Sequence, residues 1–248
     1  FTQVSGNVDG VGDGTYVSRV VPSARGAGVA YAAFDAHRDG DFAPYLFRTE
    51  DFGATWQPLH EGLPSGSILS MVEHPDNDDV LFVGTEHHLF VSTDAGDSWA
   101  PMPNLPTTAY DDLIVHPREK DLVIGTHGRG IWILDDTEAL AEWTVESATA
   151  SAHLFSVPDG TIFVYWKDTS YRGDAEYAGQ NPRDGTEITY RLGEGGGAAT
   201  LTVTNASGAV VRVLEVPSEP GTHRVNWDLR WDMDDDADRW AAHTAPRL

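Results

Sequence analysis

A repeat of 43 residues is the feature that most limits how this chain can fold. Asp51 and Asp94 are 43 residues apart, and so are Trp56 and Trp99. The flanking sequences repeat as well, and a more divergent copy lies upstream, so three copies of one unit span roughly residues 15–136. The matched stretches are RTEDFGATW (48–56) with VSTDAGDSW (91–99), ILSMVEHP (68–75) with DLIVHP (112–117), and VLFVGTE (80–86) with DLVIGTH (121–127).

Each copy contains short apolar or alternating runs that are rich in Val, Ile, Leu and Phe and are interrupted by Gly, Pro and Asp. This pattern predicts β-strands. A unit of about 40–45 residues with four antiparallel strands is the size of one blade of a β-propeller. We therefore expect an all-β fold with about three four-stranded blades. Because propellers have at least four blades, we expect the missing blades to come from the rest of the same protein or from a partner chain.

The two most similar stretches (48–56 and 91–99) are expected to form the hairpin between the third and fourth strands of a blade. An Asp can accept backbone N–H bonds within such a turn, a Gly permits a positive φ, and a Trp can bury its ring between neighbouring blades. A folding device is needed in every blade, whereas a catalytic residue is needed once, so we interpret these residues as structural. They are Asp51, Gly53, Thr55 and Trp56 in one copy and Asp94, Gly96, Ser98 and Trp99 in the next.

This turn resembles the Asp-box of bacterial-neuraminidase-type (BNR) repeats, which occur in sialidases, some endoglucanases, sortilin-like propellers and photosystem II assembly factors. The longer stretches HRDGDFAPYLFRTEDFGATW (37–56) and DLVIGTHGRGIWILDD (121–136) resemble a group of large secreted microbial sortilin-like or "glycosyl hydrolase" repeat proteins. The resemblance covers most of residues 15–231. It implies the C-terminal blades of a propeller followed by a sandwich module, in a secreted, periplasmic or cell-surface protein.

The expected domain organisation follows from where the strand pattern stops and resumes. Residues 1–136 are expected to form the C-terminal blades, and 137–151 a short helical or irregular connector. Residues 152–231 regain the alternating pattern, with turns at NASG (205–208) and SEPG (218–221), which suggests an immunoglobulin-like β-sandwich. Residues 232–248 are an acidic tail or a truncated continuation.

The alternation of antiparallel strands predicts which loops share a face of a blade. With the strands lettered A to D along the chain, the A–B and C–D turns lie on one face, and the B–C loops and D–A crossings on the other. The first copy has a long B–C loop and the third has THGRG (126–130) there. Function often lies in loops on a rigid scaffold, Arg suits carboxylate recognition, and His can act as a base or metal ligand. The candidate ligand-binding residues on this face are His37, Arg38, Asp41, Tyr45, His127 and Arg129.

The alternative is that these residues are structural, with Arg129 and Asp41 in salt bridges between adjacent blades. The sequence also leaves open whether residues on this face are catalytic. A glycosidase needs two carboxylates about 5–10 Å apart, and Asp111 and Asp112 are the candidates at the rim of this face. The arginine triad and tyrosine nucleophile of sialidases are not recognisable in the sequence.

Composition narrows the class of partner. The formal net charge is −23, with 39 Asp and Glu against 16 Lys and Arg. This charge repels phosphate backbones, so we expect no nucleic-acid partner; it also fits a halophilic or marine source, where salt screens self-repulsion. The chain has no Cys and no apolar run long enough for a membrane span. The acidic run 232–238 lacks the Gly and Glu of a calcium loop, so we expect no metal and no cofactor.

The leading expectation is therefore a secreted or periplasmic binding or scaffolding propeller that recognises a peptide, protein or glycan. One alternative is a glycoside hydrolase of the sialidase-like or endoglucanase-like type, with catalytic carboxylates partly on missing blades. Another is an assembly factor that grips a second protein.

Overall fold

The computed structural model describes residues 2–163, 183–195 and 197–231. The acidic stretch 232–248, including the run compared with a calcium loop, lies outside the described residues. The chain forms two compact units, Phe1–Trp143 and Thr144–Leu248. In the described part of the chain, every helix is too short or too polar to cross a membrane.

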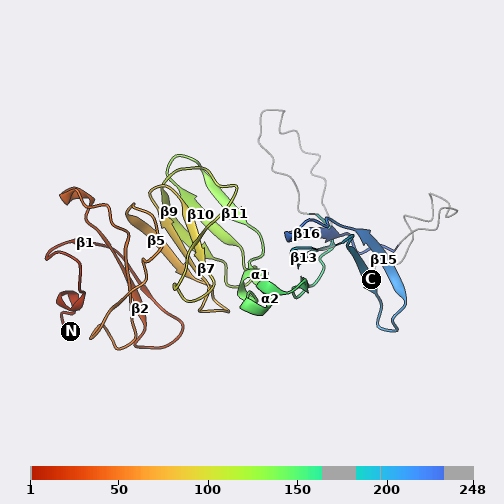
Figure 1. The fold of residues 1–248 in the computed structure, drawn as a ribbon, viewed down its shortest axis with the longest axis horizontal. Coiled ribbons are helices and arrows are strands. Elements are labelled where there is room, and N and C mark those ends of the chain that lie inside the picture. The colour runs from red at the N-terminus through yellow and green to blue at the C-terminus, as the bar shows by residue number, and fades with distance from the viewer. Residues whose placement is uncertain (1, 164–182, 196, 232–248) are drawn as a thin grey trace, which may run out of the picture. The chain divides into compact units, whose positions relative to one another are not determined.

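Unit 1 consists of three antiparallel sheets that follow one another along the chain (Figure 1). Consecutive strands pair within each sheet, as they do in the blades of a propeller. The expected all-β fold with four-stranded antiparallel sheets is confirmed, and the sheets are called blades 1, 2 and 3 below. Blade 1 contains β1 (Tyr16–Pro22), β2 (Ala30–Asp35), β3 (Tyr45–Thr49) and β4 (Gln57–Pro58); blade 2 contains β5 (Ile68–Glu73), β6 (Leu81–Thr85), β7 (Leu89–Ser92) and β8 (Ala100–Pro101); blade 3 contains β9 (Tyr110–Val115), β10 (Leu122–Thr126) and β11 (Ile131–Leu134).

Blade 3 differs from the expectation, because it has three strands within the described residues. The Asp-box sequence is absent after β11. Asp136 instead takes a left-handed conformation (φ 52°), and the short helix α1 (Glu138–Ala141) begins where blades 1 and 2 have their turn into a fourth strand. The edge of β11 is therefore not paired by a fourth strand in the part of the chain that the structure describes.

The core of unit 1 lies between the blades. Side chains of a strand alternate between its two faces, so the middle strand β6 sends Leu81 and Val83 into one cluster with blade 1. It sends Phe82, with the preceding Val80, into a second cluster with blade 3. All five residues of β6 are buried. Burial on both faces explains why its sequence is a continuous apolar run rather than an alternating one.

The innermost strand of each blade contains a β-bulge at the same place. The extra residue is Ser18 in β1, Leu69 in β5 and Asp111 in β9. A bulge bends the strand and breaks the alternation of side chains. Hydroxyl groups at or next to the bulges join neighbouring blades: Ser18 donates to the carbonyl of Ile68 (3.0 Å), and Ser70 donates to that of Tyr110 (2.6 Å).

Unit 2 contains two smaller antiparallel sheets after the helix α2 (Val145–Thr149). The three-stranded sheet has the order β12 (Ala152–Leu154), β13 (Thr186–Leu192), β16 (Gly221–Trp227). The two-stranded sheet pairs β14 (Thr200–Thr204) with β15 (Val210–Glu215). Their hairpin is the predicted NASG turn, in which the side chain of Asn205 accepts hydrogen bonds from the amides of Ser207 (3.0 Å) and Ala209 (3.0 Å).

Candidate functional site

The two Asp-box turns have the same hydrogen-bond network and connect β3 to β4 and β7 to β8. In blade 1 the carboxylate of Asp51 accepts hydrogen bonds from the hydroxyl of Thr49 (2.9 Å) and from the amide (2.8 Å) and hydroxyl (2.7 Å) of Thr55. One carboxylate thus holds both ends of the turn. The equivalent contacts in blade 2 join Asp94 to the hydroxyl of Ser92 (2.7 Å) and to the amide (2.9 Å) and hydroxyl (2.5 Å) of Ser98.

These hydrogen bonds keep both carboxylates ionised. The backbone and hydroxyl of Thr55 lower the pKa of Asp51. Burial opposes ionisation of Asp94, but the hydrogen bonds from Ser98 and Ser92 outweigh it, so the pKa of Asp94 is also lowered. A low pKa with every acceptor engaged inside its own turn suits a structural carboxylate rather than a general acid.

The backbone of each turn places two consecutive residues in the left-handed region. Gly53 (φ 84°) and Gly96 (φ 94°) were expected there, but Phe52 and Ala95 (both φ 60°) were not. The amide of Ala95 donates to the carbonyl of Asp79 (2.8 Å), in the A–B turn of the same blade. The amide of Phe52 makes the same bond to Gly28 (3.0 Å) in blade 1. The A–B and C–D turns therefore share one face, as the alternation of strands predicted.

The opposite face carries the B–C loops and D–A crossings, and we call it the B–C face. Hydrogen bonds link these segments from blade to blade. The crossing into blade 2 contacts the B–C loops of blades 1 and 2, because Ser67 donates its hydroxyl to Asp35 (2.7 Å) and accepts from the amide of Glu86 (3.3 Å). The crossing into blade 3 repeats this: the amide of Thr108 donates to His87 (3.3 Å), its hydroxyl donates to the carbonyl of His127 (2.8 Å), and the amide of His127 donates to Ala109 (2.9 Å). We call this continuous series of contacts the B–C belt.

In blade 1 the belt holds an aspartate–histidine pair. His37 lies in the short 3-10 helix η2 (His37–Asp39), and its Nδ1 is 2.6 Å from Oδ2 and 2.7 Å from Oδ1 of Asp35. Asp35 is half-buried and also accepts from the amide of His37 (3.0 Å) and the hydroxyl of Ser67. Burial opposes its ionisation, but these hydrogen bonds together lower the pKa of Asp35. The carboxylate therefore orients an exposed imidazole through its Nδ1.

A second pair of side chains, Tyr45 and Asp41, stabilises the rest of the long B–C loop. The hydroxyl of Tyr45 donates to Asp41 (2.6 Å), and the amide of Ala43 donates to the same carboxylate (3.0 Å). The hydrogen bond from Tyr45 lowers the pKa of Asp41 and raises that of Tyr45. Arg38 is exposed next to His37. The loop is thus held in one conformation by its own side chains.

Blade 3 places a similar pair on the same face. Nδ1 of His127 is 3.2 Å from Oδ2 of Asp111, and both side chains are exposed. Arg129 is exposed and contacts the carbonyl of Gly128 (3.3 Å). The structure therefore brings His127 to Asp111, which the sequence analysis had considered only as a catalytic candidate.

Asp112 lies apart from this pair, in contact with blade 1. Its Oδ1 is 3.0 Å from the guanidinium of Arg19, which also donates to the carbonyls of Asp111 (2.7 Å) and Leu69 (2.8 Å). Consecutive residues of a strand normally point to opposite faces. The bulge at Asp111 breaks this alternation, so Asp111 and Asp112 are both exposed. Their partners are a histidine and an arginine.

Salt bridges between blades are made by arginines that the sequence analysis did not single out. Arg19 joins blade 1 to blade 3, and Arg25 joins the A–B turns of blades 1 and 2 through Asp78 (3.1 Å) and Asp79 (2.5 Å). The alternative that Arg129 and Asp41 bridge the blades is not what the structure shows, because their hydrogen bonds stay within their own loops.

A comparison with protein families gives one match. The sequence model of the family Sortilin-Vps10, described as sortilin, neurotensin receptor 3, matches residues 45–182, which is more than half of the chain. The chain belongs to the Sortilin-Vps10 family. The predicted sortilin-like resemblance is therefore confirmed.

Solved structures similar to this Sortilin-Vps10 family member include GH74 enzymes. One from Niastella koreensis has 16% identity and a TM-score of 0.42, over 78% of this chain and 29% of that one. An ancestral GH74 enzyme has 23% identity and a TM-score of 0.40, over 47% and 14% of the two chains. The GH74 xyloglucanase from Xanthomonas campestris has 12% identity and a TM-score of 0.33, over 59% and 32%. The chain thus spans less than a third of each of these structures, and no curated protein matches it.

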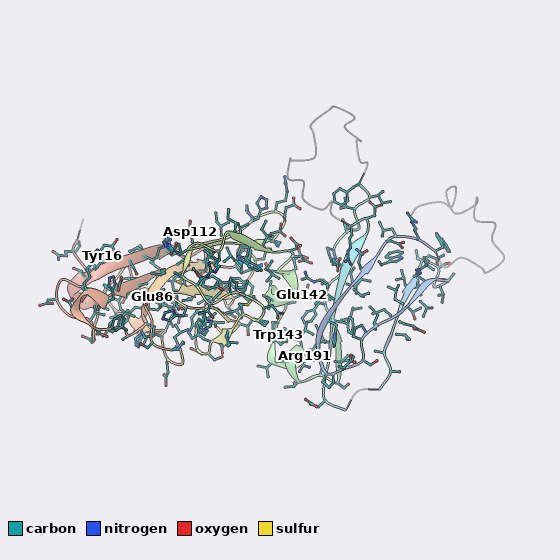
Figure 2. All side chains as sticks on the ribbon, turned by 90° about the horizontal axis from the view of Figure 1, so that it is seen from above. Tyr16, Glu86, Asp112, Glu142, Trp143 and Arg191 are labelled. Atoms are coloured by element: carbon teal, nitrogen blue, oxygen red, sulfur yellow. The ribbon has the colours of Figure 1, made fainter. Side chains whose placement is uncertain are left out.

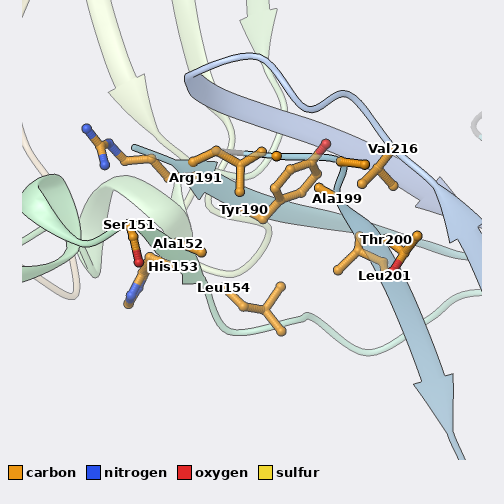
Figure 3. Close-up of a pocket in the computed structure, with 13 residues that line it drawn as sticks. Ser151, Ala152, His153, Leu154, Tyr190, Arg191, Ala199, Thr200, Leu201 and Val216 are labelled. Carbon is orange, nitrogen blue, oxygen red and sulfur yellow. The ribbon is translucent and has the colours of Figure 1, made fainter. Parts of the chain in front are cut away.

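The cavity found in this family member lies away from the predicted site. A cavity of about 700 Å³ in unit 2 is lined by residues 151–154, 190–192 and 197–201 and by Val216 (Figure 3). None of the predicted site residues lines it. In the described ranges, His, Asp and Glu side chains form no group of three that could hold a metal ion.

Among the residues of the B–C belt that sequence reasoning missed are Asp35 and Ser67. Asp35 could have been found, because it lies two residues before His37, a spacing that suits local side-chain contact in a turn. Ser67 is 32 residues from Asp35. Only the packing of blade 1 on blade 2 brings it to that carboxylate.

Proposed function

We propose that this Sortilin-Vps10 family member is part of a binding or scaffolding propeller whose B–C face holds a peptide or glycan ligand. The observation that carries the proposal is the B–C belt, which fixes aspartate–histidine pairs from blades 1 and 3 on one face. Figure 2 shows the side chains of unit 1, including Glu86 of the belt and Asp112. Both imidazoles are exposed, and Arg38 and Arg129 add exposed guanidinium groups beside them. Polar groups held by a rigid scaffold recognise a ligand with little loss of conformational entropy.

Two considerations favour binding over hydrolysis. The family description includes a neurotensin receptor, which supports a recognition role. A glycosidase of the usual kind works with two carboxylates on opposite sides of a sugar. Asp111 and Asp112 are instead paired with His127 and Arg19. They are therefore not arranged as two carboxylates on opposite sides of a substrate.

The proposal extends to the rest of the chain. Unit 2 is proposed to be an immunoglobulin-like module that spaces or docks the propeller, supported by its two antiparallel sheets and the short hairpin between β14 and β15. We further propose that the protein acts outside the cytoplasm, as a secreted, periplasmic or cell-surface protein, in keeping with the sortilin-like assignment.

The test is binding of the full chain to peptide and glycan arrays, with paired arginine variants. Arg129→Ala removes a guanidinium from the B–C face of blade 3. Arg118→Ala removes one from the opposite face of the same blade, where Arg118 is exposed and pairs with its neighbour Glu119. We expect array ligands to be retained by the Arg118 variant and weakened at least about tenfold by the Arg129 variant, the loss that one charge-assisted contact produces. Equal binding by both variants, or no ligand on either array, would overturn the proposal.

A further inference from the structure

A buried histidine connects blade 2 to the segment that follows blade 3. His74 lies in the A–B turn of blade 2 and is 1% exposed. Its Nε2 is 3.0 Å from the hydroxyl of Thr137, which precedes α1 and is also 1% exposed. The two residues are 63 positions apart in the sequence, so their contact depends on the packing of blade 3 against blade 2.

The hydrogen bonds around His74 determine which of its nitrogens carries the hydrogen. The backbone amide of Asp76 donates to Nδ1 (3.2 Å), so Nδ1 is an acceptor without a hydrogen. A neutral imidazole then carries its hydrogen on Nε2, which donates to the hydroxyl of Thr137. That hydroxyl donates to the carbonyl of Lys120 (2.6 Å), in the A–B turn of blade 3. All three hydrogen bonds therefore run in one direction, from Asp76 through His74 and Thr137 to Lys120.

A salt bridge closes this series of hydrogen bonds into a ring. The ammonium group of Lys120 pairs with the carboxylate of Asp76, and the side chain of Lys120 is only 14% exposed. We call these four residues, His74, Asp76, Lys120 and Thr137, the His74 network. The same turn also contacts the other end of α1, because the side-chain amide of Asn77 donates to the carbonyl of Ala141 (2.6 Å). The A–B turn of blade 2 therefore holds α1 at both ends.

A second hydrogen on His74 is incompatible with this network. It would lie on Nδ1 and point at the amide hydrogen of Asp76, so two donors would meet where a hydrogen bond was. It would also place a positive charge on a side chain that solvent does not reach, and burial is the main reason that the pKa of His74 is lowered. Protonation of His74 therefore weakens the attachment of α1 to blade 2.

The charged groups next to the network do not reverse this effect. Asp76 favours the protonated imidazole and Lys120 opposes it, and both influence the pKa of His74 less than burial does. In α1, the pKa of Glu138 is raised, mainly by burial and then by neighbouring carboxylates. A carboxyl group with a raised folded pKa is stabilised by acid, so protonation of Glu138 opposes release of α1. The charged groups of the adjoining segments are Asp76 in the turn of His74, Lys120 and Asp121 in blade 3, and Asp136, Glu138 and Glu142 after blade 3.

We propose that His74 makes the attachment of α1 to the blades sensitive to acid: the neutral imidazole holds the start of α1, and its protonation releases residues 137–142, which lead into unit 2. Release is expected below about pH 6.5, because a base with a lowered folded pKa contributes its full stability above its unfolded pKa and loses it as the pH falls towards the folded pKa. The network lies at the A–B turns and not on the B–C face, so this inference is independent of the proposed ligand.

Hydrogen exchange of the full chain at several pH values tests the proposal. The amides of Ala141 and Glu142 donate to the carbonyls of Thr137 and Glu138, so they report on the state of α1. After correction for the intrinsic exchange rate, we expect their protection factors to fall at least about tenfold between about pH 7.5 and about pH 5, because opening coupled to the uptake of one proton changes up to about tenfold per pH unit. The amides of β6 should keep their protection. Constant protection in α1, or an equal loss in β6, would overturn the proposal.

Matched substitutions separate His74 from other groups that titrate. His74→Gln keeps an N–H for Thr137 but cannot take up a proton, so protection in α1 should change by less than about twofold over the same pH range. His116→Gln is the control, because His116 has the same place in blade 3 and its Nδ1 also accepts a backbone amide, that of Glu119 (3.0 Å), but its side chain is partly exposed. This variant should lose protection in acid as the wild type does. An equal loss in the His74 variant would show that another group is responsible.

If His74→Gln does not fold, nuclear magnetic resonance of the wild-type imidazole decides. We expect the hydrogen of His74 to be on Nε2 at neutral pH, and His74 to become protonated in the same pH range in which the amides of α1 lose protection. A hydrogen on Nδ1 at neutral pH, or protonation of His74 without a change in α1, would contradict the proposal.

Discussion

At the residue scale, carboxylates in this protein differ by what surrounds them. Asp51 and Asp94 are saturated by hydrogen bonds within a turn, whereas Asp35 and Asp111 orient exposed histidines on the B–C face. The chemistry of the side chain is the same in all four. What differs is the partner, which is a hydroxyl or amide of the same turn for Asp51 and Asp94 and an exposed imidazole for Asp35 and Asp111.

Asp94 predicts a dependence of stability on acid. Its pKa is lowered in the folded state relative to about 3.9 in an unfolded chain. A carboxyl group with a lowered folded pKa contributes stability that is fully present above its unfolded pKa and is lost as the pH falls through its folded pKa. We therefore expect Asp94→Asn to lower the free energy of unfolding by about 1 kcal/mol at pH 7, and to flatten the loss of stability below about pH 4.

Urea unfolding of the wild type and the variant between pH 7 and pH 2.5 measures this difference. Asp97→Asn is the control, because Asp97 is an exposed aspartate in the same turn. A difference between wild type and the Asp94 variant that stays constant down to the lowest pH would contradict the assignment.

At the element scale, the blades are joined through the bulged inner strands. The bulges let Ser18 and Ser70 reach the neighbouring strand and place Asp111 at the rim of the B–C face. The same close approach explains the glycine in β6. A Cβ at Gly84 would meet the hydroxyl of Ser70 in its own blade and, at 2.6 Å, the carbonyl of Tyr110 in blade 3.

The repeat supplies a matched test of this packing. Gly125 in β10 is the equivalent of Gly84, but its nearest contact for a Cβ is 3.5 Å away, at the carbonyl of Asp112. We expect Gly84→Ala to destabilise unit 1 by about 2 kcal/mol, the usual cost of overpacking, and Gly125→Ala to change stability by less than about 0.5 kcal/mol. Thermal and urea unfolding measure the loss of stability in both variants. Equal losses would show that blade 3 does not pack closely against β6.

At the scale of the whole molecule, the charge of −23 is the dominant property. The 39 Asp and Glu outnumber the 16 Lys and Arg, so the excess carboxylates repel one another in the folded state. We expect the unfolding temperature to rise by roughly 5 °C between 0.1 and 1 M NaCl, because the screening length falls from about 10 Å to about 3 Å.

Differential scanning calorimetry at several salt concentrations measures this rise. A variant with the exposed residues Asp9 and Asp13 replaced by Lys carries less negative charge and should show a smaller rise. An unfolding temperature that is independent of NaCl would argue against self-repulsion and against the halophilic interpretation.

Much of the fold of unit 1 was predictable because its information is local and repeated. The spacing of Asp51 and Asp94 predicted the blades, and the alternation of short apolar runs predicted the strands, their pairing order and the two faces. A gap in the prediction was the fourth strand of blade 3, where the sequence DDTEAL (135–140) already departs from the Asp-box.

By itself the sequence determined the family, the repeated strand order and the position of the Asp-box turns, because each depends on residues close together in the chain. Only the tertiary structure decided that His37 and His127 are held by Asp35 and Asp111 and that Arg19 and Arg25 join the blades. The physical reason is that hydrogen bonds and salt bridges between blades depend on bulges and on side chains from distant parts of the chain. A pattern of hydrophobic residues specifies which face of a strand is buried, but not which polar groups then meet across it.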